Sequence, residues 1–210
     1  MIRPTPLTEP RTLPLRRWIW PAMLLFLAAC SRAPQPDWKL TNVSGHLPDL
    51  AFHLTDGAGR PVTARDFRGH DVVLYFGYTH CPDACPLTMT HLHLVMQKLG
   101  PLADRVRILF VSVDPARDTP KIVGEYAAAF DPRAVGLTGS MNEIVTLAKR
   151  YRVAFTRGPD LGHGAYEVNH SSAIYVFDSE GRARLLASPA NSEDDIAGDL
   201  RLLIGMEHPS

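Results

Sequence analysis

The pattern of apolar and polar positions along the chain predicts several buried strands. A short apolar run bounded by polar or turn-forming residues is typical of a strand inside a sheet. The clearest run covers residues 106–113, and residues 72–76 form another. Shorter runs predict further strands at residues 51–55, 153–156 and 172–177.

Helices are predicted where helical periodicity follows a capping residue or an initial proline. Proline costs little in the first turn of a helix, and Pro86 and Pro120 both stand at such starts. Either Asp118 or Thr119 can cap the helix that begins at Pro120. Residues 140–143 have the capping-box pattern. The predicted helices end near residues 99, 130, 151 and 204, and the last begins after Ser192.

The order of these elements predicts the fold class. Strands that alternate with helices and are apolar throughout indicate an α/β fold, with a central mixed sheet flanked by helices on both faces. Two cysteines, Cys81 and Cys85, lie between the strand at 72–76 and the helix that follows. Thiols at the end of a strand and the start of a helix indicate a thioredoxin-like arrangement. A helix N-terminus also favours the thiolate.

The N-terminus has the features of a secretory signal. Arg16 and Arg17 precede an apolar run at residues 18–29 that is short for a membrane span. Residues 27–30, Leu-Ala-Ala-Cys, resemble a bacterial lipobox, in which Cys30 is lipidated; an uncleaved signal anchor is the alternative. We therefore expect a signal peptide at 1–29, a flexible tether at 30–46 and one folded domain at 47–207. The expected location is the periplasmic side of the bacterial cell envelope, on a membrane.

Charge argues against a nucleic-acid partner. The chain has 22 basic and 22 acidic residues, and removing residues 1–29, with four arginines and one glutamate, leaves 18 and 21. A net charge of −3 provides no basic surface for nucleic acid.

With Cys30 assigned to the lipid, only Cys81 and Cys85 remain as thiols. Residues at i and i+4 share one helical face, with Cα atoms about 6 Å apart, so the pair can close a disulfide or bind one soft metal ion. The alternative without a function is a pair of buried, unreactive cysteines. Burial is disfavoured by the adjacent prolines, Pro82 and Pro86, and by the polar Asp83 between the two cysteines.

His170 is a candidate third ligand. Thioredoxin-like reductases commonly place a cis-proline opposite their cysteines, before a strand, but this chain has no proline between Pro159 and Pro189 and has His170 at about that place. Two thiolates and an imidazole suit Cu(I) and can also hold Cu(II), while zinc stays compatible with these ligand types. A packed or hydrogen-bonded histidine is the ordinary alternative. His80 and His163 are weaker candidates, because the first is expected in a solvated loop and the second between glycines in a mobile loop.

Three segments together resemble the Sco/SenC family of copper chaperones. They are Phe-Gly-Tyr-Thr-His-Cys-Pro-Asp-Ala-Cys-Pro at 76–86, Ser-Val-Asp-Pro-Ala-Arg-Asp-Thr-Pro at 112–120 and Asn-His-Ser-Ser-Ala-Ile-Tyr at 169–175. The resemblance implies a thioredoxin-like fold and one copper ion, Cu(I) or Cu(II), held by Cys81, Cys85 and His170. Ala84 stands where the family usually has valine, and Asn169 where it usually has aspartate, which removes a carboxylate beside the ligand.

The resemblance also implies a function. We expect a membrane-tethered metallochaperone, not an enzyme, that delivers copper to the binuclear copper centre of cytochrome c oxidase. Its partners would be the copper-site subunit of the oxidase and other periplasmic copper chaperones or thiol reductases. The main alternative is a thiol-disulfide oxidoreductase that uses Cys81 and Cys85 as a redox pair on the oxidase copper site or another envelope protein. A redox or copper sensor and a peroxidase are the less favoured readings.

Overall fold

The computed structural model describes residues 36–163 and 165–207. Its centre is a set of parallel strands: β4 (Asp71–Gly77) pairs with β5 (Val106–Ser112), and β5 pairs with β6 (Ala134–Thr138). The other neighbours are antiparallel, in the order β1-β10-β9-β4-β5-β6-β2-β3. Their bounds are β1 Thr41–Asn42, β2 His53–Asp56, β3 Pro61–Thr63, β9 Ile174–Phe177 and β10 Ala183–Ala187. The predicted mixed sheet is confirmed.

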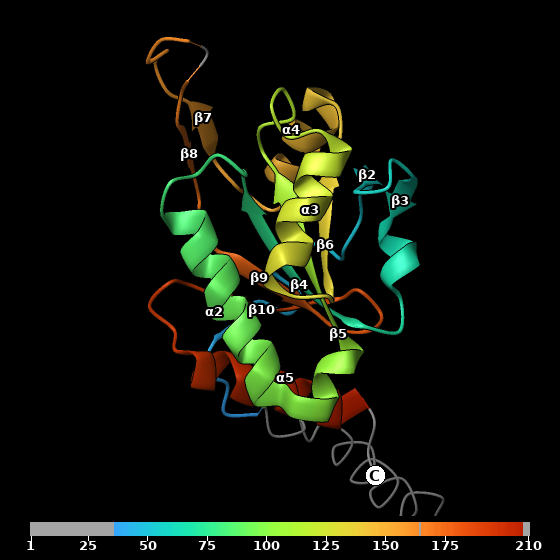
Figure 1. The fold of residues 1–210 in the computed structure, drawn as a ribbon. Helices are drawn as coiled ribbons and strands as arrows, with labels where there is room; N and C mark the ends of the chain where they lie inside the picture. Colours follow the sequence, from blue (N-terminus) through green and yellow to red (C-terminus); the bar gives the residue numbers. More distant parts are fainter. Residues whose placement is uncertain (1–35, 164, 208–210) are drawn as a thin grey trace, which may run out of the picture. The chain divides into compact units, whose positions relative to one another are not determined.

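Helices cover both faces of the sheet (Figure 1). They are α2 (Ala84–Leu99), α3 (Pro120–Phe130), α4 (Met141–Arg150) and α5 (Glu193–Glu207), with short 3-10 helices η3 (Ala64–Phe67) and η4 (Gly100–Arg105). On one face α2 contacts both α3 and α5, and the Tyr75 hydroxyl lies 3.7 Å from the sulfur of Cys85 in α2. On the other face Phe76 packs on Tyr175, which contacts Tyr151 at the end of α4.

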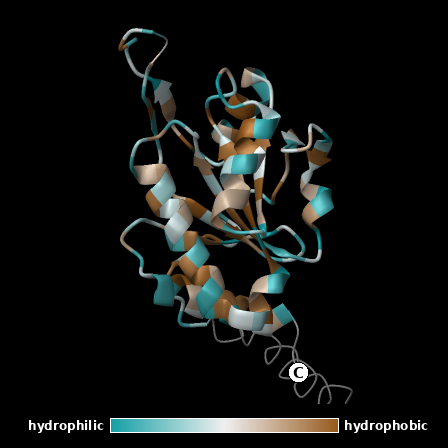
Figure 2. Ribbon diagram, in the orientation of Figure 1, coloured by the Kyte–Doolittle hydropathy of each residue, from teal (hydrophilic) through white to brown (hydrophobic). Residues whose placement is uncertain are grey.

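This division follows from the strand itself, because Tyr75 and Phe76 are consecutive in β4 and project to opposite faces. All seven residues of β4 are buried. In Figure 2 the hydrophobic residues accordingly lie along the central strands and the connecting loops are mostly hydrophilic. The α/β fold predicted from the sequence, thioredoxin-like in placing the thiols between a central strand and a helix, is confirmed.

A separate two-stranded ribbon extends from the sheet. It pairs β7 (Phe155–Arg157) with β8 (Val168–His170), so that Phe155 lies opposite His170. The sequence predicted a strand at 153–156; the structure shifts it toward the C-terminus and places it outside the main sheet. The reason is tertiary, since Val153 is buried in the core cluster and its N–H bonds to Ala148 O at the end of α4.

The tether predicted to extend to residue 46 is wrong in its second half. Residues 41–42 form β1, which adds to the sheet beside β10, and Leu40 and Val43 on either side are buried. The Asp199 carboxylate of α5 accepts the backbone N–H of Leu40 at 2.8 Å. Burial of two apolar side chains, together with a charged acceptor, offsets the cost of ordering this segment. Trp38 also packs against the core, so the packed chain includes residues from Trp38 onward.

A buried acid at the start of β4 makes stability depend on pH. Asp71 is 2% exposed, and burial, followed by the nearby Glu207 and Asp178 carboxylates, raises its pKa to about 8. The folded state therefore holds a proton that the unfolded state releases near its ordinary pKa of 3.8. The free energy of unfolding is expected to fall as pH rises from about 4 to about 8, by at most about 1.4 kcal/mol per pH unit.

Urea unfolding of Asp71→Asn across this pH range tests that expectation. The substitution should flatten the slope, whereas the control Asp37→Asn, at an exposed side chain, should keep it. A slope that is the same in wild type and Asp71→Asn contradicts the assignment.

Candidate metal centre

The two predicted thiols lie at the connection between β4 and α2. Cys81 is half-buried in the connecting loop, and Cys85 is fully buried in the first turn of α2. The N-cap residue Asp83 makes no side-chain capping bond; instead the Cys81 sulfur accepts the backbone N–H of Cys85 at 3.4 Å. The sulfur of Cys81 thus accepts one of the backbone N–H groups that have no partner within the first turn of the helix.

The two thiols differ in acidity. Burial opposes ionisation of Cys81, but the backbone N–H groups of Asp83 and Cys85 outweigh it and lower the Cys81 pKa. For Cys85, burial dominates and raises the pKa to about 12, although the hydrogen bond that the Tyr75 hydroxyl donates to the sulfur acts to lower it. The centre therefore presents one accessible thiol of lowered pKa and one buried thiol of raised pKa.

Gly77, at the end of β4, makes room for the buried sulfur. A Cβ atom there would lie 3.0 Å from the Cys85 sulfur and 2.7 Å from Cε2 of Phe110, both closer than ordinary contact. Any larger residue at this position would displace the sulfur or the ring.

His170, the last residue of β8, completes the group. Its Nδ1 lies 3.0 Å from the Ser171 carbonyl, which can only accept, so Nδ1 carries the proton and Nε2 keeps its lone pair. Nε2 lies 3.3 Å from the sulfur of Cys85, and burial lowers the His170 pKa. The rings of Tyr75 and Tyr78 meet the imidazole edge-on at 6.1 and 6.0 Å. A neutral imidazole held in this way is ready to bind a metal.

The structure brings the three predicted ligands together: one atom from each of Cys81, Cys85 and His170 lies within 4.8 Å of the others. Two sulfurs and one nitrogen form a soft donor set, and the orientation of His170 directs its lone pair into that set. Copper fits this chemistry better than magnesium or calcium, which prefer oxygen.

Asp118 supports the loop that carries the thiols, a role that the sequence did not reveal. Its fully buried carboxylate accepts the Thr79 N–H at 2.9 Å, the Thr79 hydroxyl at 2.6 Å and the Ser112 hydroxyl at 2.6 Å. Asp118 was one of two predicted caps for α3; the structure assigns the cap to Thr119, which accepts from Ile122 N–H.

Asp114 and Arg117 support the ribbon that carries His170. Asp114 accepts the Tyr166 hydroxyl at 2.6 Å and is paired with Arg117. Arg117 also donates to the Tyr166 carbonyl at 3.0 Å and stacks 3.6 Å above the Tyr166 ring, whose other stacking partner is Arg157 at 3.8 Å. The segment at 112–120 therefore holds both the loop that carries the thiols and the ribbon that carries His170. The sequence predicted only a turn and a helix start for this segment.

The remaining candidates lie outside the converging set. His80 is exposed beside Cys81, and His163 is exposed in the loop between β7 and β8. Asn169 is exposed and pairs with Thr156, so strand alternation turns its side chain away from that of His170. Cys30 and the predicted signal peptide lie outside the described residues. Among those described, no helix has the length and apolar character needed to cross a membrane.

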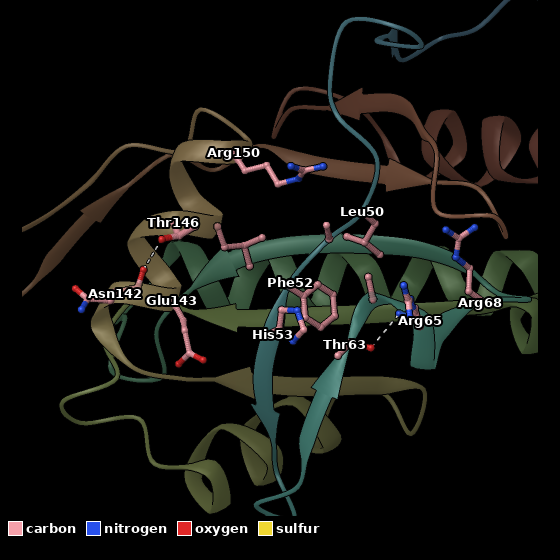
Figure 3. A pocket seen from close by; sticks show the side chains of 13 residues that line it. Leu50, Phe52, His53, Thr63, Arg65, Arg68, Asn142, Glu143, Thr146 and Arg150 are labelled. Carbon is pink, nitrogen blue, oxygen red and sulfur yellow. Dashed lines mark hydrogen bonds between the residues drawn. The ribbon is translucent and has the colours of Figure 1, made fainter.

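A separate groove of about 700 Å³ lies between β2, η3 and α4 (Figure 3). Its polar side chains largely serve local structure: Arg150 donates to the Asp49 carbonyl, and Glu143 closes the capping box of α4. His53 lines this groove, but none of the three converging ligands does.

Comparisons with known proteins agree with this geometry. The model of the family described as SCO1/SenC matches residues 44–205. The chain is 44% identical over 132 residues to the mitochondrial SCO2 homolog of Danio rerio, covering 62% of this chain and 47% of that protein. The match thus spans about half the length of that relative.

Solved structures are similar over most of the chain. Bradyrhizobium japonicum ScoI with copper bound is 36% identical, with a TM-score of 0.68 over 74% of this chain and 98% of its own. BsSco, a member of the Sco family of cytochrome c oxidase assembly proteins in which a disulfide switch was identified, is 26% identical, with a TM-score of 0.62 over 80% and 98%.

Proposed function

Because the chain belongs to the SCO1/SenC family, we propose that it is a copper metallochaperone acting in the assembly of cytochrome c oxidase. The observation that carries this proposal is the convergence of Cys81, Cys85 and His170 within 4.8 Å. The relative from Bradyrhizobium with copper bound, and the oxidase-assembly role of the Sco family that includes BsSco, support it. One copper ion per chain would bind as Cu(I) or Cu(II).

Delivery to a partner requires ligands that the partner can reach. Cys81 and His170 are half-buried while Cys85 is fully buried, so a partner would displace Cys81 and His170 first and Cys85 last. The proposed recipient is the copper-site subunit of cytochrome c oxidase, and other copper chaperones or thiol reductases would load or reduce the site.

A thiol-disulfide oxidoreductase is the second candidate, favoured by the unequal thiols. An accessible thiol of lowered pKa beside a buried one of raised pKa is the arrangement of an attacking and a resolving cysteine. The disulfide switch identified in BsSco agrees with such chemistry. This activity would need both sulfurs but not His170.

His170 therefore separates the two candidates. We expect His170→Ala to weaken Cu(I) binding about tenfold and Cu(II) binding about a hundredfold or more, because the imidazole is the ligand that Cu(II) favours over thiolate alone. Anaerobic titration of the reduced protein against a competing chelator measures the Cu(I) affinity. Displacement of bound Cu(II) by a chelator measures the Cu(II) affinity. The control is His46→Ala, at an exposed histidine outside the converging set. Full Cu(II) affinity in His170→Ala would contradict the ligand set and favour the redox pair.

We further propose that Cys30 carries a lipid and that this anchors the domain on the periplasmic face of a bacterial membrane, with residues 1–29 removed. The short polar stretch between Cys30 and Trp38, which packs against the core, would be the tether. Growth with labelled palmitate should label the wild-type protein and not Cys30→Ser. Equal labelling of the two would contradict the anchor.

A further inference from the structure

The groove between β2, η3 and α4 combines an apolar floor with cationic walls. Leu50 and Phe52 line it and are buried side chains of the core. In Figure 3 they lie between Arg150, which belongs to α4, and the pair Arg65 and Arg68, which belongs to η3 and its C-cap. The groove therefore places three guanidinium groups around an apolar surface.

The short helix η3 directs Arg65 and Arg68 to the same side. A 3-10 helix has three residues per turn, so side chains three positions apart stand above one another. The turn is held by the Thr63 hydroxyl, which accepts the Arg65 N–H at 3.3 Å, and by the Arg68 N–H, which donates to the Arg65 carbonyl at 3.2 Å. The Asp66 carboxylate accepts the Thr63 N–H at 2.6 Å and the Thr63 hydroxyl at 2.9 Å. Asp66 thus closes the capping box and does not neutralise Arg65.

Arg150, on the opposite wall, is held by backbone instead of by an acid. Its Nε and Nη2 donate to the Asp49 carbonyl at 3.2 and 2.8 Å. Glu143 is the acidic residue of the lining, and its Oε2 accepts the N–H and the hydroxyl of Ser140 at 2.7 Å each. Figure 3 shows Glu143 at the end of the groove remote from the two arginines of η3. Among the described residues, none of the three guanidinium groups pairs with a carboxylate.

We propose that this groove binds a small organic acid with an apolar body, of the kind represented by a medium-chain fatty acid. The carboxylate pairs with Arg65 and Arg68, because the guanidinium fork matches the two carboxylate oxygens. The apolar body covers Leu50, Phe52 and Leu147 and is removed from water there. A volume of about 700 Å³ suits a small-molecule ligand. The inference goes beyond the proposed function, since none of the three converging ligands lines the groove.

Decanoate, kept below its micellar concentration, is the probe for the wild-type protein. Isothermal titration calorimetry should show one site per chain with a Kd below about 1 mM. Acetate lacks the apolar body and decyltrimethylammonium has the opposite charge, so neither should give saturable binding. A short peptide of apolar residues flanked by aspartates should bind more weakly than decanoate. Absence of decanoate binding, equal binding of acetate or the cation, or tighter binding of the peptide overturns the proposal.

Variants at exposed positions locate the site without disturbing the core. Arg65→Gln/Arg68→Gln should weaken decanoate binding about tenfold, whereas Arg105→Gln, at an exposed arginine outside the groove, should not change it. Ala51→Glu adds a carboxylate at an exposed position of the lining and should weaken binding about tenfold relative to Ala51→Gln, which has nearly the same size. Unchanged affinity in the double arginine variant overturns the proposal. Cys81→Ser should bind decanoate like wild type, so failure of the copper site and failure of this groove are distinguishable.

Discussion

Serine in place of either Cys81 or Cys85 is expected to abolish stoichiometric copper binding. Each substitution replaces a soft thiolate by a hydroxyl that stays protonated and bonds weakly to Cu(I), leaving one sulfur and one imidazole. We expect Cu(I) affinity to fall at least about a thousandfold, which corresponds to about 4 kcal/mol. Anaerobic competition with a chelator of known affinity, on fully reduced protein, measures this loss.

The matched control is Ala84→Ser, which adds a hydroxyl at the exposed position between the two thiols and removes no sulfur. It should bind copper like wild type. Cys81→Ser, at a half-buried position, should unfold at nearly the wild-type urea concentration. Cys85→Ser places a smaller and more polar group in the core and should lower the free energy of unfolding by about 1–3 kcal/mol, so copper binding is compared without denaturant. Tight one-to-one binding by either cysteine variant would show that the ion is held elsewhere.

Two of the three proposed ligands could be located from the sequence because a local pattern places them. β4 ends at Gly77 and α2 begins at Ala84, so the local sequence places Cys81 in the short loop between them and Cys85 in the first turn of the helix. The prediction that both cysteines lie on one helical face is wrong, because Cys81 precedes the helix. His170 needed the family resemblance, since its approach to Cys85 bridges 85 positions of the chain.

The supporting residues could not be predicted for the same reason. Asp118 bonds to Thr79 across 39 positions, and Tyr166 to Asp114 across 52. Such contacts follow from how the strands are ordered in the sheet, and no local spacing encodes them. Locally, the Asp118 and Thr119 pair looked like two equivalent caps.

The strands that could not be predicted from the sequence also depend on contacts between distant parts of the chain. Gly136 lies in the middle of β6, where glycine argues against a strand. Glycine is required there by the packing of α3 on β6, because a Cβ atom at this position would lie 2.0 Å from the Val123 carbonyl oxygen. Conversely, a capping signal acts within one turn: the capping box at Ser140 was predicted at its observed position, and the observed cap Thr119 was one of the two residues predicted for α3.

Alanine in place of Asp118 is expected to destabilise the fold and the metal centre together. The substitution leaves the Thr79 N–H and the buried Ser112 hydroxyl without an acceptor, and it releases the loop that carries the thiols. Loss of a buried, charged acceptor of this kind costs about 3–5 kcal/mol. Urea unfolding measures the stability, and Cu(I) competition under native conditions should show weaker binding because Cys81 is no longer held.

Thr119→Ala, one residue further along, is the control that separates this role from helix capping. Loss of the cap bond to Ile122 should cost about 1 kcal/mol. It should leave Cu(I) affinity unchanged, because α3 starts beyond the residues that hold the thiol loop. If Asp118→Ala costs no more than Thr119→Ala and binds copper equally well, the carboxylate is not what holds the loop. A larger loss of both stability and affinity in Asp118→Ala follows directly from the three bonds that its carboxylate accepts.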